Sequence, residues 1–254
     1  MASTRTRPLI GITADVEPVS GSATGAYRVR VGGAYLDAVV AAGGVPVVLH
    51  PDPALAAEYV ASVDGLLLTG GNDVDTTKWG VKMHPKAVPM HERRQAFEVA
   101  LLAAIDGVRG GETPTLGVCL GMQMMGVHRA GIGALEQHLP DAFAGAERHS
   151  SAPGVGDGKH TIRATRAWGE SPLAAVEHGG AVASSHHQGI RRDAAESGRL
   201  RTLAVSEDGI LEAFDDPSKP FYVGVQWHPE RTADAALGQG VVARLVEAAR
   251  GRIS

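Results

Sequence analysis

Short apolar runs rich in valine, isoleucine and leucine alternate with longer segments of helical period through the first half of the chain. Brief apolar runs between turn residues are typical of strands, whereas apolar residues spaced by three and four are typical of helices. This alternation predicts β-α-β units and a parallel sheet. The strands expected in this half span residues 8–13, 45–49, 65–69 and 113–118.

The helices expected between these strands have recognisable starts and ends. Residues 34–42 place apolar side chains at helical spacing and stop at Gly43-Gly44, which is a helix C-terminal signal. Asp52 followed by Pro53 indicates an N-cap and the first turn of a helix that runs to about residue 62. Helical spacing returns over residues 91–105, and a further helix is expected after Cys119.

The second half of the chain has a different pattern. Residues 141–159 contain five glycines or prolines and no apolar period, which predicts an insertion or a flexible loop. Turns separate most of the later strands, which favours antiparallel additions to the sheet. These strands are expected near residues 160–166, 181–185, 200–205, 210–214 and 221–227, with an amphipathic helix over 232–250. Because no repeat or linker interrupts the pattern, residues 1–254 are expected to form one α/β domain with a mostly parallel central sheet.

Composition and charge narrow the class of protein. Hydrophobic residues make up 44% and charged residues 20% of the 254 residues, which excludes a disordered chain or a coiled coil. The net charge is −4 and there is no basic run, so neither nucleic acid nor a membrane surface is expected as a partner. The N-terminal residues include no apolar segment long enough for a signal peptide, and no stretch suits a membrane span. A single cysteine cannot form an internal disulfide, which fits a reducing, cytoplasmic compartment.

That cysteine lies in the strongest local motif of the chain. Gly117-Val118-Cys119-Leu120-Gly121 has the G-x-C-x-G form of a nucleophile elbow between an expected strand and an expected helix. Glycines two residues before and after the nucleophile relieve crowding at such a turn. The thiol would then lie at a helix N-terminus, where the dipole favours a thiolate. A buried structural cysteine is the alternative, and the flanking glycines argue against it.

Thioester chemistry also needs a base and oxyanion donors. His228 lies at the end of the apolar strand 221–227, and Glu230 is close enough to orient its imidazole. Gly70-Gly71-Asn72 follows another strand, so its flexible backbone could direct the Gly71 N–H toward the oxyanion, with the Leu120 N–H as second donor. Taken singly, His-Pro-Glu and the glycine pair are ordinary turns; their order after strands carries the inference.

Three stretches together resemble the class I glutamine amidotransferase superfamily: residues 67–71 (LLTGG), 117–123 (GVCLGMQ) and 224–230 (GVQWHPE). Residues 35–46, 185–188 and 208–213 are similar to its free-standing branch, the γ-glutamyl-γ-aminobutyrate hydrolase or peptidase C26 family. The resemblance implies a glutamine amidotransferase-like fold with helices on both faces of the sheet. It also implies hydrolysis of a γ-glutamyl amide through a cysteine thioester, without a cofactor.

The resemblance assigns roles residue by residue. Catalysis is expected from Cys119 as nucleophile, His228 as base and Glu230 as orienting residue, with Gly71 and Leu120 as oxyanion donors. The residues expected to bind substrate are Gly70, Gln123, His186, His187 and Gln188. The expected partner is a small-molecule γ-glutamyl substrate, with polyamine or amine catabolism as the setting. Whether the chain forms a homodimer is left open.

Two alternatives remain open. Leu120 stands where the hydrolase branch commonly has arginine, and C-L-G-x-Q is usual in glutaminase domains, so a glutaminase subunit that delivers ammonia to a partner synthase is the second hypothesis. A non-catalytic binding protein is the third, and the intact Cys119, His228 and Glu230 oppose it.

The pair His186-His187 raises the question of a metal site. Adjacent histidines on a strand point to opposite faces, and no cysteine or carboxylate cluster accompanies them in the sequence. A pocket or structural role is therefore expected for the pair, and no metal is expected.

Overall fold

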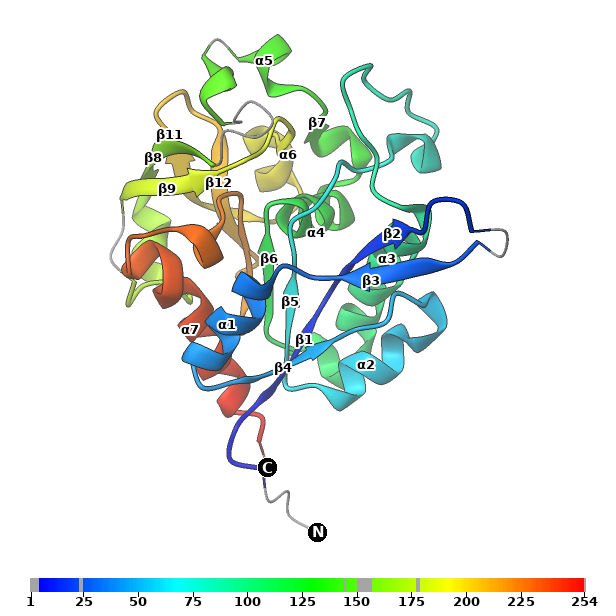
Figure 1. The fold of residues 1–254 in the computed structure, drawn as a ribbon. Coiled ribbons are helices and arrows are strands. Elements are labelled where there is room, and N and C mark those ends of the chain that lie inside the picture. Colours follow the sequence, from blue (N-terminus) through cyan, green and yellow to red (C-terminus); the bar gives the residue numbers. More distant parts are fainter. Residues whose placement is uncertain (1–4, 23–24, 144, 150–156, 177–178, 254) are drawn as a thin grey trace.

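A nine-stranded mixed sheet forms the centre of the computed structural model, which describes residues 5–22, 25–143, 145–149, 157–176 and 179–253 (Figure 1). The strand order is β4-β1-β5-β6-β13-β12-β11-β8-β9. The first five of these strands run parallel: β4 (Val45–Val48), β1 (Leu9–Ile12), β5 (Gly65–Leu68), β6 (Thr115–Val118) and β13 (Tyr222–Val225). The other four pair antiparallel: β12 (Leu211–Asp215), β11 (Arg201–Ser206), β8 (Gly158–Ala164) and β9 (Gly180–Ser184).

Helices connect the strands, as the periodicity predicts. They are α1 (Gly33–Ala41), α2 (Ala56–Ser62), α3 (Glu92–Gly107), α4 (Leu120–Ala130), α5 (Leu139–Ala142), α6 (Arg192–Ser197) and α7 (Val241–Arg250). Short 3₁₀ turns are η1 (Pro53–Leu55), η2 (Thr76–Trp79), η3 (Val108–Gly111), η4 (Ile132–Ala134), η5 (Ala146–His149), η6 (Arg166–Glu170) and η7 (Pro229–Arg231), and one π turn, η8 (Ala236–Gly240), precedes α7. Asp52 and His91 cap η1 and α3 through side-chain hydrogen bonds to backbone N–H groups.

Both faces of the sheet are covered, and β5 shows how. Leu67 packs into one core with residues of α1 and α7, whereas Leu66 and Leu68 pack into a second core with residues of α2, α3 and α4. All three leucines are fully buried. Successive side chains of a strand point to opposite faces, so a continuous apolar run such as this one requires helices on both sides. Figure 1 shows α1 and α7 next to one another and α2 beside α3.

The α/β fold expected from the sequence is confirmed, and so are all the strands and helices predicted in the first half. One pairing was wrong. β13 was expected among the antiparallel additions, and it does pair antiparallel with β12, but it also pairs parallel with β6 and lies in the middle of the sheet. Its four residues are all buried, which is the property of a central parallel strand rather than of an edge.

The sequence pattern did not predict several elements of the structure. The hairpin of β2 (Asp15–Pro18) and β3 (Tyr27–Arg30) was missed because β2 shows no apolar alternation and the alternation of β3 spans only four mostly exposed residues. The two-residue strands β7 (Leu135–Glu136) and β10 (Gly189–Ile190) are too short to be predicted, and the six-residue helix α6 was not predicted. The loop expected over 141–159 includes η5 and the start of β8, and its residues 150–156 lie outside the described part.

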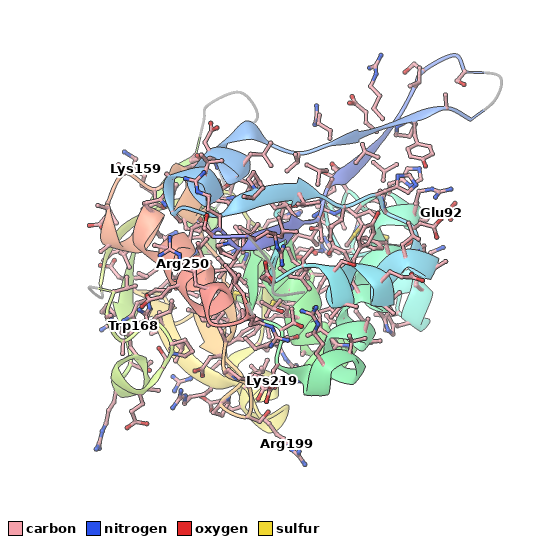
Figure 2. The ribbon with its side chains drawn as sticks, turned by 90° about the horizontal axis from the view of Figure 1, so that it is seen from below. Glu92, Lys159, Trp168, Arg199, Lys219 and Arg250 are labelled. Atoms are coloured by element: carbon pink, nitrogen blue, oxygen red, sulfur yellow. The ribbon has the colours of Figure 1, made fainter. Side chains whose placement is uncertain are left out.

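Charged side chains such as Lys159, Arg199 and Arg250 lie at the periphery of the molecule (Figure 2). No helix in the described part of the chain combines the length and the apolar character that crossing a membrane requires.

Because both faces of β5 are packed, shortening one of its buried leucines should lower the stability of the protein substantially. Leu67→Ala should lower the free energy of unfolding by about 2–5 kcal/mol, because it leaves a cavity among fully buried neighbours. Val40→Ala on the exposed side of α1, where the side chain is 48% exposed, should change it by less than about 0.5 kcal/mol. Urea denaturation of both variants measures the difference, and equal losses would contradict this account of the core.

Candidate active site

Cys119 lies at the sharp turn between β6 and α4, as the motif predicts. Its backbone has φ 51° and ψ −107°, in a region that non-glycine residues rarely adopt. The residue is 5% exposed. Strained backbone of this kind is found at functional sites, where the surrounding structure holds it.

The glycines that flank Cys119 are required by close packing. A Cβ at Gly117 would lie 2.7 Å from the carbonyl carbon of Gly121. A Cβ at Gly121 would lie 2.7 Å from the carbonyl carbon of Leu68 on β5. Neither position has room for a side chain, so the turn can form only with glycine on both sides of the cysteine.

His228 and Glu230 form a pair directly after β13. The Nδ1 atom of His228 lies 2.8 Å from Oε1 of Glu230, and both side chains are nearly buried. The backbone N–H of His228 donates to the carbonyl of Ala183 on β9 at 2.9 Å, which fixes the loop. With Nδ1 bound to Glu230, Nε2 is the nitrogen that remains for exchange of a proton with a thiol.

The surroundings of His228 favour its charged form. Burial by itself lowers the pKa of the imidazole, but interactions with Cys119 and Glu230 outweigh it and raise the pKa from 6.5 to about 9. The imidazole is therefore protonated at neutral pH. A positive charge next to a cysteine sulfur is the arrangement that favours a thiolate.

Tyr35 of α1 also belongs to this site, although no motif in the sequence indicates a functional role for it. Its hydroxyl accepts a hydrogen bond from the Gly70 N–H at 3.0 Å and lies 3.4 Å from Nδ1 of His228. Burial and the nearby Glu230 carboxylate hold the pKa of this phenol well above its ordinary value, so it stays neutral. Tyr35 thus connects the glycine loop to the histidine. In the sequence it is one apolar position of a helix, and only its hydroxyl distinguishes it from the other core residues.

The glycine loop is held from the other side by Arg94, a fully buried arginine of α3. Its guanidinium donates to the carbonyls of Thr69 at 2.9 Å and Gly70 at 3.1 Å, and to Glu98 at 2.9 Å. The Gly70 C=O and the Gly71 N–H belong to one planar trans peptide and point in opposite directions. Because Arg94 binds the carbonyl, the Gly71 N–H is directed away from the guanidinium.

The structure brings together the catalytic residues and the oxyanion donors predicted from sequence. A Cβ on Gly70 would lie 2.9 Å from Cε1 of His228 and 3.5 Å from Cβ of Cys119. A Cβ on Gly71 would lie 3.0 Å from Cδ2 of Leu120 and would collide with the Arg94 guanidinium. The glycine loop therefore lies against the elbow and the histidine. Gly70 itself uses its N–H and C=O within the protein, on Tyr35 and Arg94.

Among the residues expected to bind substrate, Gln123 and Gln188 are buried, and their side chains form hydrogen bonds within the protein. Gln123 donates to the Gln188 carbonyl at 3.0 Å and to Oε1 of Gln226 at 3.3 Å. The side chain of Gln188 accepts from the Val74 N–H at 3.3 Å. His187 differs, because its side chain is 29% exposed, with Nε2 2.8 Å from the Asp73 carboxylate. The substrate-binding role of these residues stays a prediction.

The two adjacent histidines do diverge, although they lie in the loop after β9 rather than on a strand. The ring of His186 contacts His149, His160 and Glu212 instead of the His228–Glu230 pair. No carboxylate cluster accompanies the histidines in the sequence, but the fold brings one carboxylate, Glu212 of β12, to His186 from a distant part of the chain.

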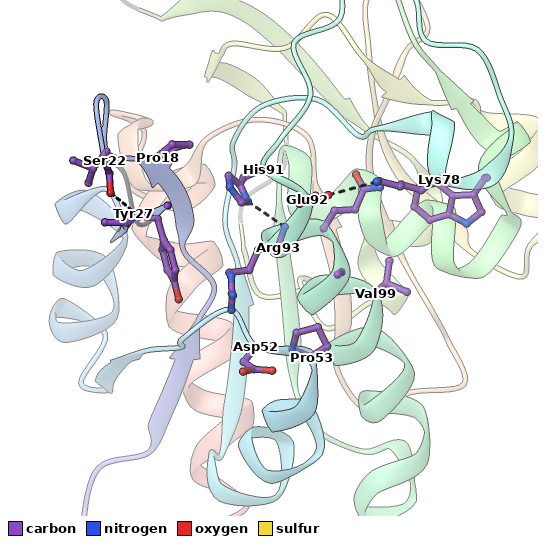
Figure 3. Close-up of a pocket in the computed structure, with 16 residues that line it drawn as sticks. Pro18, Ser22, Tyr27, Asp52, Pro53, Lys78, His91, Glu92, Arg93 and Val99 are labelled. Atoms are coloured by element: carbon purple, nitrogen blue, oxygen red, sulfur yellow. Dashed lines mark hydrogen bonds and ion pairs between the residues drawn. The ribbon is translucent and has the colours of Figure 1, made fainter.

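A separate cavity of about 1170 Å³ opens between the β2–β3 hairpin and the start of α3 (Figure 3). Tyr27, Trp79, His91 and Arg93 are among its lining residues, and none of the three expected catalytic residues is. The cavity and the candidate active site are connected through neighbouring residues of α3: Gln95 lines the cavity, and the preceding Arg94 binds the glycine loop.

Solved structures share this fold. The glutaminase domain of a Trypanosoma brucei CTPS with bound acivicin has a TM-score of 0.63 and 14% identity, with 97% of this chain and 95% of that chain covered. A glutamine amidotransferase from Thermotoga maritima has a TM-score of 0.56 and 13% identity, with 98% and 99% covered. The architecture described above is therefore the glutamine amidotransferase fold.

Sequence comparison gives the family. A model of the peptidase C26 family matches residues 8–230, and the chain belongs to that family. A Mycobacterium tuberculosis protein named "Putative glutamine amidotransferase Rv2859c" is 35% identical over 236 residues, covering 90% of this chain and 71% of the relative. The γ-glutamyl-γ-aminobutyrate hydrolase PuuD of Escherichia coli K12 is 27% identical over 247 residues, covering 91% and 88%. The family assignment from the sequence motifs is thus confirmed.

The environment of His228 predicts a measurable titration. The imidazole should titrate near pH 9, and Glu230→Gln should lower this pKa because it removes the negative charge that stabilises the imidazolium. Glu196→Gln on the exposed side of α6 makes the same chemical change without touching His228 and should leave the pKa unchanged. NMR titration of the His228 ring gives the values. A wild-type pKa near 6.5, or equal values in wild type and Glu230→Gln, would contradict the pairing.

Proposed function

We propose that this chain is a cysteine-dependent hydrolase that cleaves γ-glutamyl amides to glutamate and an amine through a thioester. The observation that supports it is the convergence on Cys119, at its strained turn, of the His228–Glu230 pair and the glycine loop. The family and a relative named as a γ-glutamyl-γ-aminobutyrate hydrolase agree with this chemistry. A free thiol as nucleophile suits a reducing cytoplasm.

In the first half-reaction the Cys119 thiolate attacks the γ-carbonyl carbon of the substrate. The carbonyl π electrons move to oxygen, and the resulting oxyanion is stabilised by the N–H groups of Gly71 and Leu120. His228 then gives its proton to the amide nitrogen as the C–N bond breaks, and the neutral amine leaves. The thioester and a neutral imidazole remain.

In the second half-reaction water replaces the amine. The neutral His228 takes a proton from water as its oxygen attacks the thioester carbon, and a second oxyanion forms at the same donors. Collapse breaks the C–S bond and releases glutamate, which restores the thiolate and the protonated imidazole. Glu230 keeps the ring oriented and stabilises its positive charge in both steps.

Substrate recognition requires polar groups for the α-amino and α-carboxylate of the glutamyl part. Of the expected binding side chains, His187 is the one with substantial exposure, and its Asp73 partner adds a carboxylate. Buried Gln123 and Gln188 support the backbone around this position. We therefore assign contact with the glutamyl group to His187 and Asp73.

The second candidate is a glutaminase subunit of a separate synthase. The relative named as a glutamine amidotransferase and the C-L-G-x-Q sequence at Cys119 favour it. The fixed glycine loop favours the free-standing hydrolase, because Arg94 of this same chain binds the carbonyl of the Gly70–Gly71 peptide and Tyr35 binds the Gly70 N–H. A donor that is already aligned needs no docking event to complete the oxyanion site.

Activity of the purified chain decides between the two. We expect it to hydrolyse γ-glutamyl-γ-aminobutyrate and γ-glutamylputrescine with a kcat of roughly 1–10³ s⁻¹, and glutamine less efficiently. Cys119→Ala should lose activity by a factor on the order of 10³ or more while keeping the thermal midpoint of unfolding. A preference for glutamine, or inactivity until a second protein is added, would favour the glutaminase subunit.

Arg94 should act through the glycine loop. Arg94→Lys keeps the charge but loses the planar fork that binds two carbonyls, so the Gly71 N–H should lose its alignment. We expect kcat to fall by roughly 10²–10³-fold with KM nearly unchanged, as for loss of one oxyanion donor. Arg93→Lys, at the neighbouring position on the cavity wall, is the matched control. A rise in KM alone would show that Arg94 serves binding rather than the transition state.

A further inference from the structure

Three histidines and one glutamate meet beside the antiparallel half of the sheet, and the mechanism above uses none of them. They are His149 at the end of η5, His160 of β8, His186 after β9 and Glu212 of β12. Their side chains are 1%, 7%, 1% and 0% exposed, respectively. Four separate elements thus bring ligand-type side chains to one buried point.

The distances within the cluster match those of a metal site. Oε1 of Glu212 lies 3.2 Å from Nδ1 of His149, 3.0 Å from Nε2 of His160 and 3.6 Å from Nε2 of His186. The His149 and His186 nitrogens are 3.2 Å apart. Four ligands held about 2.0–2.1 Å from a tetrahedral zinc ion are separated from one another by about 3.3–3.4 Å.

The outer nitrogens of two rings are already bound. Nε2 of His149 lies 2.9 Å from the Asp208 carboxylate, and Nδ1 of His186 lies 2.9 Å from the Gln188 carbonyl. Such acceptors fix the N–H on the outer nitrogen and direct a lone pair inward, as around metal-bound histidines. Two inward lone pairs cannot bond to each other, so the His149 and His186 nitrogens need either a proton or a metal ion between them.

Glu212 has the same requirement. Its two oxygens and both ring nitrogens of His160 have no directed hydrogen bond among the described residues, although all are buried. A buried carboxylate without compensation is costly.

We propose that His149, His160, His186 and Glu212 bind one divalent transition-metal ion, and that this ion is Zn²⁺. Three imidazoles and one carboxylate are ligands that zinc accepts in a four-coordinate site. The two positive charges are balanced by Glu212 and the adjacent Asp208. Because all four positions are taken by protein and the ligands are buried, the site is structural rather than catalytic.

The fold gives the ion a path from solvent, and a bound ion would hold the neighbouring loop in place. A small cavity of about 170 Å³ is lined by His149, His160 and Asp208, so the ion can reach its ligands from solvent. The ion fixes the loop that carries His186. The next residue, His187, is the one assigned above to the substrate. The carbonyl of the residue after it, Gln188, accepts a hydrogen bond from Gln123 of α4. It also ties η5 to β8 and β12.

Zinc binding to the whole chain tests the site directly. The untagged protein, in a Cys119→Ser background that removes the thiol, is stripped with a chelator, titrated with Zn²⁺ and assayed by elemental analysis and thermal unfolding. We expect one zinc per chain and a higher thermal midpoint with zinc. His160→Asn should lose this zinc, and Asp208→Asn, which keeps all four ligands, should weaken binding by about 10–100-fold.

Two controls separate this cluster from other histidines. His187→Asn removes the neighbouring ring that points away, and His84→Asn disrupts the more exposed group of His84, His138 and Asp141. Both variants should keep one zinc per chain. The proposal is refuted if the parent protein, with all four ligands intact, binds no zinc above the stripped background, since the cluster then holds protons only. It is also refuted if His160→Asn and Asp208→Asn bind zinc as the parent does.

Discussion

The candidate site depends on one buried guanidinium. Arg94 is fully enclosed, and its hydrogen bonds to the carbonyls of Thr69 and Gly70 replace the water that those groups would otherwise bind. Glu98, one turn along α3, neutralises its charge. An ion pair at this depth is weak evidence for stability, because desolvation offsets the attraction. Arg94 instead fixes the orientation of the glycine loop that follows β5, and with it the backbone groups that face Cys119.

Much of the site could be predicted because each of its parts ends a strand. Cys119 follows β6, Gly70 and Gly71 follow β5, and His228 follows β13. These three strands are neighbours and run parallel, so their carboxyl ends lie at one edge of the sheet. The local motifs and the order of elements were sufficient to bring the residues together, although the sequence pattern misjudged how β13 pairs.

The remaining features required contacts between residues that are far apart in the chain. Tyr35 is indistinguishable by periodicity from any apolar position of its helix, yet its hydroxyl reaches Gly70. Glu212 did carry a signal, since a carboxylate within the apolar run of β12 must find a cation or a donor. Its partners follow only from the fold, because His160 lies on β8, His186 follows the neighbouring strand β9, and His149 ends η5.

The loop that carries His228 has a second effect at the far end of the sheet. β9 is the last strand in the order, and a terminal strand exposes backbone groups that can pair with another molecule. The His228 N–H donates to the carbonyl of Ala183 on β9, and the Ala183 N–H donates to the hydroxyl of Thr232 in the same loop. Loosening this loop would therefore uncover a strand edge and make the protein prone to self-association.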